Sequence, residues 1–194
     1  MAFAQIFHSY GVKLGVVAAR QNWDISPLVS TEARWGLDVG GFVEPIQIAP
    51  VSILGEMHYI QKGTKYIATE TYRANNLLGY EDRLVTYNPR LDYLSFAVFG
   101  KLSVEVSILK VSCFAGPRLD VVIGKEDDGL TGLYDKFKQT DFGTTLGLGF
   151  ESLLIREPTL SLEFRYSPSL IDAYTTTIRS VKNDSFEILV GIQL

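Results

Sequence analysis

What the 194-residue chain has little of narrows its class first. It contains one cysteine, Cys113, which excludes a disulfide framework and a cysteine-rich structural zinc site. Its only histidines are His8 and His58, and neither lies in a His-Glu-x-x-His motif. The net charge of -4 lacks the basic excess of a nucleic-acid binder. We therefore expect no nucleic-acid partner, no metal site and no cofactor.

The sequence also lacks any long hydrophobic run. A membrane-spanning helix needs roughly 18 or more consecutive apolar residues, and charged residues interrupt every apolar stretch of this chain. Even so, 46% of the residues are hydrophobic, and the mean hydropathy of +0.12 is high for a soluble protein. The apolar residues are therefore distributed over many shorter segments.

Those segments share a period of two. Apolar residues recur at every second position over stretches of about ten residues, which is typical of strands with two unlike faces. A tilted strand needs roughly 9 to 11 residues to cross a bilayer, whereas strands of soluble proteins are usually about five or six residues long. The eight predicted strands are residues 10–19, 35–44, 51–59, 94–102, 111–121, 142–151, 160–167 and 186–194.

The connections between these strands alternate in length. Short links cover residues 44–50, 103–107 and 152–158, and long polar links cover residues 20–34, 62–92, 124–140 and 169–185. All long links thus fall at one end, as in bacterial outer-membrane barrels with short periplasmic turns and long extracellular loops. We predict an all-β protein, an eight-stranded antiparallel up-and-down transmembrane β-barrel, with both termini periplasmic.

The positions of the charged residues indicate which face of the strands points into the lumen. The charged residues lie opposite the apolar face, and we predict that they form an ion-pair network in the lumen, because eight strands leave room only for side chains. This predicted network comprises Lys13, Asp38, Glu56, His58, Lys101, Arg118, Asp120, Glu163, Arg165 and Glu187. The alternative is a soluble, lipocalin-like small-ligand binder, in which this charged face would point outward.

Glycines share the charged face. Because the interior of a small barrel is crowded, we expect six of them to relieve that crowding: Gly15, Gly40, Gly116, Gly147, Gly149 and Gly191. Aromatic residues near the strand ends predict interfacial girdles on the outer surface. The candidate girdle residues are Tyr10, Trp35, Tyr59, Tyr66, Tyr93, Phe142 and Tyr166.

The longest link, residues 62–92, is rich in tyrosine and arginine, a composition that suits a partner interface. The candidate contact residues are Tyr66, Tyr72, Arg73, Tyr80, Arg83, Tyr87 and Arg90. At the other extreme of the chain, residues 1–5 carry Ala2 and Ala4 in the small-residue spacing that precedes a signal cleavage site. We interpret residues 1–5 as the remnant of a signal peptide and residues 6–194 as one barrel domain.

The ordered set of strand motifs resembles the PorT-like outer-membrane β-barrel family. The matching segments are Tyr10-Gly-Val-Lys-Leu-Gly15, Gly41-Phe-Val-Glu44, Gly55-Glu-Met-His-Tyr-Ile-Gln-Lys-Gly63, Asp92-Tyr-Leu94, Phe114-Ala-Gly-Pro117, Asp141-Phe-Gly143 and Leu160-Ser-Leu-Glu-Phe-Arg-Tyr166. The resemblance implies an exported eight-stranded barrel in the outer membrane of a Gram-negative bacterium. The chain departs from the pattern in its short N-terminus and in ending on Leu194, where the insertion machinery often reads an aromatic residue.

These observations favour a non-enzymatic protein with a structural or surface-interaction role, alone or as a subunit of a secretion or envelope complex. Its expected partners are outer-membrane lipid and other envelope or secretion-complex proteins. The alternative function is that of a lipid-modifying outer-membrane enzyme. His58 is the candidate acid–base residue for that chemistry, but the sequence places no serine beside it.

Overall fold

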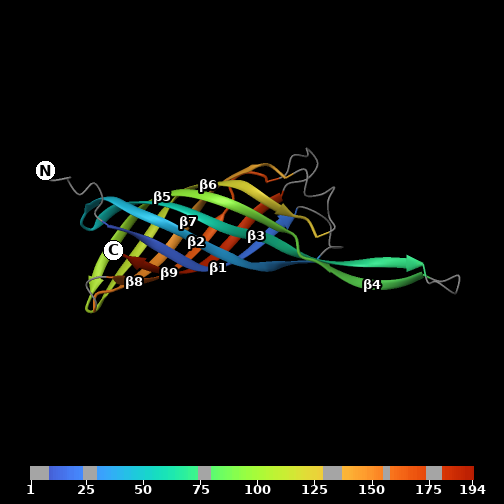
Figure 1. Ribbon diagram of the computed structural model, residues 1–194, viewed down its shortest axis with the longest axis horizontal. Helices are drawn as coiled ribbons and strands as arrows, with labels where there is room; N and C mark the ends of the chain where they lie inside the picture. The colour runs from blue at the N-terminus through green and yellow to red at the C-terminus, as the bar shows by residue number, and fades with distance from the viewer. Residues whose placement is uncertain (1–8, 24–29, 74–79, 129–136, 155–157, 174–180) are drawn as a thin grey trace.

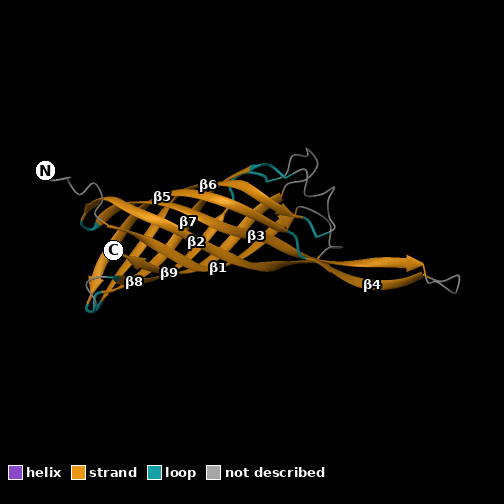
Figure 2. Cartoon of the chain, viewed as in Figure 1, coloured by secondary structure: helices purple, strands orange, loops and turns teal. Residues whose placement is uncertain are grey.

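The computed structural model describes residues 9–23, 30–73, 80–128, 137–154, 158–173 and 181–194, and in these residues the regular structure is β-strand (Figures 1 and 2). Among them, no helix is long and apolar enough to cross a membrane. The predicted signal remnant, residues 1–5, lies outside the described residues. The strands are β1 (Ser9–Trp23), β2 (Ser30–Ile48), β3 (Val51–Arg73), β4 (Tyr80–Tyr87), β5 (Arg90–Val106), β6 (Leu109–Glu126), β7 (Thr140–Ser152), β8 (Thr159–Pro168) and β9 (Val181–Gln193).

Eight of the nine strands close into a ring. The order around the sheet is β2-β1-β9-β8-β7-β6-β5-β3, and the pairing of β2 with β3 joins its ends. Every neighbouring pair is antiparallel. A closed ring leaves no unpaired strand edge, which is what hydrocarbon requires of a strand protein. The predicted eight-stranded antiparallel up-and-down barrel is therefore confirmed.

The prediction was wrong about the longest link. Within this link, residues 62–73 and 80–87 are strand and not loop, because β3 continues to Arg73 and pairs with β4 through eight residue pairs, from Tyr66↔Tyr87 to Arg73↔Tyr80. The resulting β3–β4 hairpin projects from one end of the barrel (Figure 1). The local reason is that β-branched residues recur at Ile67, Thr69 and Thr71, so strand propensity persists where the polar composition indicated a loop.

The barrel has its apolar residues outside and its charged residues inside. Leu14, Val98 and Val190 are more than half exposed on the outer wall, at 57%, 55% and 54%. The inward positions of the same strands hold buried charges such as Lys13 and Glu187. A soluble, lipocalin-like cup needs the opposite arrangement, with charged residues outside and apolar residues inside. The observed polarity therefore overturns that alternative. An apolar outer wall is the surface that lipid solvates.

The inward glycines occupy positions that leave no room for a side chain, as the sequence analysis predicts. A Cβ atom on Gly147 would lie 2.2 Å from the Phe114 ring, and one on Gly40 would lie 2.4 Å from the His58 ring. On the outer wall, a Cβ on Gly100 would meet nothing nearer than 4.0 Å. Crowding therefore explains the inward Gly147 and Gly40 and does not explain the outward Gly100.

Aromatic residues on the outer wall lie near both ends of the barrel strands. Tyr10, Trp35, Phe142 and Tyr166 are 42–62% exposed, and Tyr59 is half-buried. The girdle prediction was wrong for two residues, listed here with their exposure: Tyr66 at 6% and Tyr93 at 1%. The alternation of side chains explains both errors, because Tyr66 has the parity of inward Lys62, and Tyr93 has that of inward Ser95.

Candidate functional site

All ten residues of the predicted network are buried, with relative exposures of 7% or less. They come from seven of the eight ring strands, and none of the ten lies on β7. Because their side chains share the inward parity of their strands, closure of the ring brings residues that are distant in sequence into one interior volume.

The central cluster joins strands on opposite sides of the sheet order. Arg165 on β8 contacts Glu56 on β3 through two hydrogen bonds, Nη1 to Oε2 at 2.6 Å and Nη2 to Oε1 at 2.9 Å. Lys13 on β1 donates from Nζ to Glu56 and to Glu163, each at 2.6 Å. Arg165 also pairs with Glu163 on its own strand. Two cations thus contact two carboxylates, and this pairing offsets the loss of hydration that each charge suffers on burial.

His58 lies at the edge of this cluster between two carboxylates. Its Nδ1 is 2.6 Å from Asp38 Oδ1, and its Nε2 is 3.2 Å from Glu56 Oε2. Ser95 is the register partner of His58 across β3 and β5, a proximity that the sequence could not show. Ser95 is also the register partner of Asp120 across β5 and β6. Because both ring nitrogens of His58 face carboxylates, His58 belongs to the ion-pair network.

Two further clusters extend the network along the lumen. Lys62 Nζ lies 2.6 Å from Asp120 Oδ2, and Arg118 Nε lies 3.0 Å from the same oxygen. Arg118 also lies 3.9 Å from Glu187. The second of these clusters is formed by Lys101, which is 2.6 Å from Glu151 and 3.4 Å from Glu44.

Four buried charged residues were missing from the predicted network: Glu44, Lys62, Asp141 and Glu151. Side-chain alternation could have placed two of them in the lumen, because Glu44 has the parity of Asp38 and Glu151 has the parity of Gly149. Lys62 and Asp141 lie just outside the predicted strands 51–59 and 142–151, so the alternation of side chains assigned neither of them to a face. Asp141 accepts hydrogen bonds from Ser169 at 2.6 Å and from Asn183 at 2.8 Å.

Apolar side chains fill much of the remaining interior. One cluster, Phe42, Leu54, Ala97, Phe99 and Phe114, packs beside the central charges. The Arg165 guanidinium lies 5.1 Å from the centroid of the Phe114 ring. Near the hairpin end, a second cluster consists of Tyr66, Leu91, Tyr93, Phe137, Ala173 and Val181. The interior is therefore packed with side chains, as expected for eight strands.

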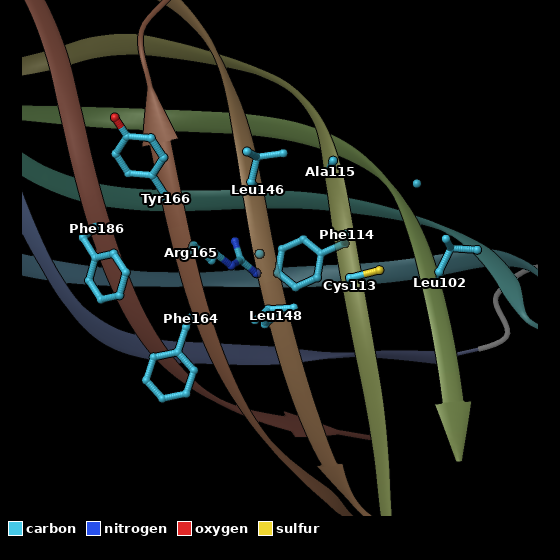
Figure 3. Close-up of a pocket in the computed structure, with 12 residues that line it drawn as sticks. Leu102, Cys113, Phe114, Ala115, Leu146, Leu148, Phe164, Arg165, Tyr166 and Phe186 are labelled. Carbon is cyan, nitrogen blue, oxygen red and sulfur yellow. The ribbon is translucent and has the colours of Figure 1, made fainter. Parts of the chain in front are cut away.

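The outer wall has a groove lined by residues of β5, β6, β7, β8 and β9 (Figure 3). Small residues such as Gly100, Ala115 and Gly147 form its floor, and Leu102, Leu148 and Phe186 stand around it. The lumen residues Phe114 and Arg165 lie behind the floor (Figure 3). The Arg165 guanidinium is already engaged by Glu56. We therefore assign this groove to the apolar outer surface.

The structure separates the candidate contact residues of the hairpin. Tyr66 is a lumen residue that donates its hydroxyl to Gln21 Oε1 at 2.8 Å, so it is removed from the contact set. Arg90 lies at the base of the hairpin, with Nε 3.0 Å from Asp92 and Nη1 3.2 Å from Glu126.

Of the other candidates, Tyr87 packs against the apolar cluster at the hairpin end of the lumen, and Arg83 is exposed. The backbones of Tyr72, Arg73 and Tyr80 belong to the hairpin, but their side chains lie outside the described residues. Arg83 is thus the candidate that the structure places on the surface of the projecting part.

A closed antiparallel ring with an apolar exterior and a charged, packed interior defines an integral membrane β-barrel. The chain matches the outer membrane protein beta-barrel domain family over residues 3–175 and belongs to that family. This match confirms the predicted outer-membrane barrel at the level of the broad family and supports an outer-membrane location. A search of curated proteins finds no match.

Solved structures of small outer-membrane proteins share the fold. The outer membrane protein OprG from Pseudomonas aeruginosa is 10% identical, with 97% of this chain and 97% of that chain covered and a TM-score of 0.52. Neisserial surface protein A is 14% identical, with 94% of this chain and 96% of that chain covered and a TM-score of 0.51. At such identities the similarity concerns the fold alone.

Proposed function

We propose that this outer-membrane barrel is a non-enzymatic surface-interaction protein that binds a protein partner through the β3–β4 hairpin. The observation that carries the proposal is the length of β3, which runs for 23 residues and continues beyond the ring to pair with β4. A barrel wall needs only about 9 to 11 residues per strand. The additional residues therefore serve a feature outside the wall.

The orientation that accompanies this proposal places the hairpin outside the cell and both termini in the periplasm, in a Gram-negative envelope. The described chain ends and the short turns lie at the end opposite the hairpin (Figure 1). Short periplasmic turns and long extracellular connections are the usual asymmetry of such barrels. Cell-surface labelling tests this orientation. In a Cys113→Ser background, Thr71→Cys should react with an impermeant maleimide in intact cells, and Glu105→Cys should react only after the outer membrane is permeabilised.

The hairpin offers a strand edge for binding. Among the described residues, β4 pairs with β3 and has no second strand neighbour. A two-stranded ribbon is marginally stable alone, and an exposed edge is a template for pairing with another chain. Next to this edge, Leu84 is 72% exposed, and Arg83 and Thr86 are also exposed. We therefore propose that the partner adds an extended segment to β4, with an acidic residue facing Arg83 and an apolar residue facing Leu84.

A second copy in the same membrane fits this edge poorly. The hairpin projects along the long axis of the barrel (Figure 1), so two copies with the same insertion would bring their β4 strands together in parallel. In register, Arg83 would then lie beside Arg83 of the other copy, and like charges abreast in a sheet are destabilising. A segment of a different protein avoids this repulsion.

Shortening the hairpin tests the proposal. Residues 68–85 are replaced by Asn-Gly, which leaves the Ile67↔Thr86 pair to close the turn and keeps Lys62 and Tyr66 in the lumen. Partners are captured by crosslinking on intact cells. We expect the shortened protein to lose partners that the full chain and a Glu105→Gln control retain. An unchanged set of partners, with the barrel still folded, would contradict the proposal.

The resemblance to the PorT-like family supports a narrower version, in which the partner belongs to a secretion or envelope complex. Under that version, the partner lost on shortening the hairpin should itself be an envelope protein. It should also co-purify with the full-length chain in detergent without crosslinking. A partner from outside the cell envelope would favour an adhesive role instead.

A further inference from the structure

The short-turn end of the barrel carries exposed aliphatic residues where water-facing turns usually carry polar ones. Ile48 at the β2–β3 turn is 74% exposed, Ile108 at the β5–β6 turn is 52% exposed, and Leu154 after β7 is 70% exposed. Turns in water favour Gly, Asn, Asp, Ser and Pro for their conformational and hydrogen-bonding properties. Three aliphatic residues at three turns at the same end therefore need an explanation.

The β5–β6 turn extends beyond the end of the neighbouring strand β3. The pairing of β3 with β5 ends at Val51↔Leu102, whereas the pairing of β5 with β6 continues to Val106↔Leu109. The adjacent turn after β7 is attached to it, because the Leu153 amide donates to the Ile108 carbonyl at 2.9 Å. We call this surface the apolar rim. It comprises Val104, Val106, Ile108, Leu109, Leu153 and Leu154, which are 39–70% exposed.

The apolar rim is continuous with the lipid-facing wall. On β5, the outward row runs from Leu94 through Phe96, Val98 and Leu102 to Val104 and Val106 without a charged residue. Twelve residue steps of about 3.3 Å, tilted by about 40°, give a height of roughly 30 Å. This exceeds the apolar band of about 25 Å that is typical of such barrels. The row therefore extends to or beyond the edge of the hydrocarbon.

Charges at this end point away from the rim surface. Lys101, Glu44 and Glu151 are buried in the lumen, where they pair with one another. Lys110, near the turn, reaches Glu151 Oε2 at 3.1 Å from a largely buried position. The outward surface thus remains aliphatic up to the turn, where only Glu105 on the inward row is a charged exposed residue of β5.

We propose that the apolar rim inserts into the lipid interface at the short-turn end, so that Ile108 and Leu154 contact acyl chains and not water or a protein. Continuity with the lipid-facing row of β5 favours lipid as the occupant, because a protein seated on the rim would also have to displace lipid beside Leu102 and Val104. The inference is independent of the function proposed for the hairpin and of which leaflet the turns enter.

Spin-label accessibility tests the proposal on the full chain. In a Cys113→Ser background, nitroxides are attached to Ile108→Cys and Leu154→Cys, and the protein is reconstituted in phosphatidylcholine–phosphatidylglycerol vesicles. Val98→Cys provides the lipid reference and Thr71→Cys the water reference. Because oxygen partitions into the acyl region and nickel chelates stay in water, we expect the oxygen-to-nickel collision ratio at both rim sites to exceed the Thr71 value several-fold and to approach the Val98 value.

A collision ratio equal to that of Thr71 at both rim sites would overturn the proposal and leave the turns in water. Labels that are shielded from both oxygen and nickel would also overturn it, because that result indicates protein contact. Heat-dependent migration on a detergent gel confirms that each labelled barrel is folded. As a second measurement, Leu154→Trp is made in a Trp23→Phe, Trp35→Phe background, so that residue 154 is the sole tryptophan. Its fluorescence should be quenched by lipids brominated near the headgroup, and a lack of quenching would contradict insertion.

Discussion

Arg165 and Glu56 are 109 positions apart in the sequence and face each other as a bidentate pair, with nitrogen–oxygen distances of 2.6 and 2.9 Å. The pair links β8 to β3 across the lumen, and both side chains are at least 96% buried. Planar guanidinium and carboxylate groups match each other in this geometry. Because Lys13 and Glu163 complete the charge balance, we regard the cluster as the element that holds the two sides of the barrel in one register.

Removing one member of this pair should destabilise the barrel strongly. Arg165→Met leaves Glu56 and Glu163 buried with less compensating charge, and breaking a buried pair typically costs about 3–5 kcal/mol. We expect a loss of that order in the free energy of unfolding, measured by urea titration in lipid vesicles. The exposed residue Glu105 provides a control. Glu105→Gln should change the free energy of unfolding little, because surface substitutions usually alter it by no more than about 0.5 kcal/mol.

The double variant Arg165→Met with Glu56→Leu separates a lost attraction from an uncompensated charge. If the cost of the single variant comes from stranded carboxylate charge, the double variant should be more stable than the sum of the two single losses predicts. Strict additivity would show that Arg165 and Glu56 do not act as a pair. Lys13 remains in both variants to balance Glu163.

Two glycines should differ in their response to the same substitution. Gly147→Ala would place a methyl group 2.2 Å from the Phe114 ring, whereas Gly100→Ala meets nothing nearer than 4.0 Å. Overpacking of this kind typically costs about 1–3 kcal/mol. We expect Gly147→Ala to lower the unfolding free energy by that amount and Gly100→Ala to leave it nearly unchanged. Phe114→Leu should partly restore the Gly147→Ala variant, and equal effects of both alanines would contradict this account.

The alternation of side chains explains how much of this interior could be predicted from the sequence. A period of two fixes which face each residue occupies, so Lys13, Asp38 and Glu163 could be assigned to the lumen without knowing any strand partner. It could not reveal that Arg165 meets Glu56 or that Ser95 lies opposite His58. Those contacts depend on ring closure and stagger, which are set by all eight strands together and not by local sequence.

The hairpin marks the other limit of the sequence analysis. Polar composition indicated a loop over residues 62–92, yet polarity there reflects exposure to water and not a lack of regular structure. Ile67, Thr69 and Thr71 retain strand propensity, and pairing with β4 supplies their backbone partners. Tyr66 was misassigned to the surface for the same reason, since in a strand its parity places it in the lumen beside Gln21.

His58 provides the test that separates a structural from an enzymatic role. Its two ring nitrogens face Asp38 and Glu56 inside the wall, so we expect no catalytic function for it. The purified protein should not hydrolyse or transfer acyl groups of phospholipid or lipopolysaccharide in detergent micelles, and His58→Gln should lower stability only. Activity that is present in the parent and lost in a folded His58→Gln variant would instead establish the lipid-modifying alternative.

The free edge of β4 predicts a contrast between two neighbouring prolines. In a strand, successive amides point to opposite edges, so of Leu84 and Val85 one amide faces β3 and the other faces the open edge. Proline removes the donor, which edge strands tolerate only where the amide faces solvent. One of the variants Leu84→Pro and Val85→Pro should therefore disrupt the hairpin. The other should keep β3–β4 pairing, seen as slow amide hydrogen exchange in the rest of the hairpin, and still lose the crosslinked partner. If that second variant retains the partner while removal of residues 68–85 abolishes binding, the hairpin is the contact site but strand addition is not its mode.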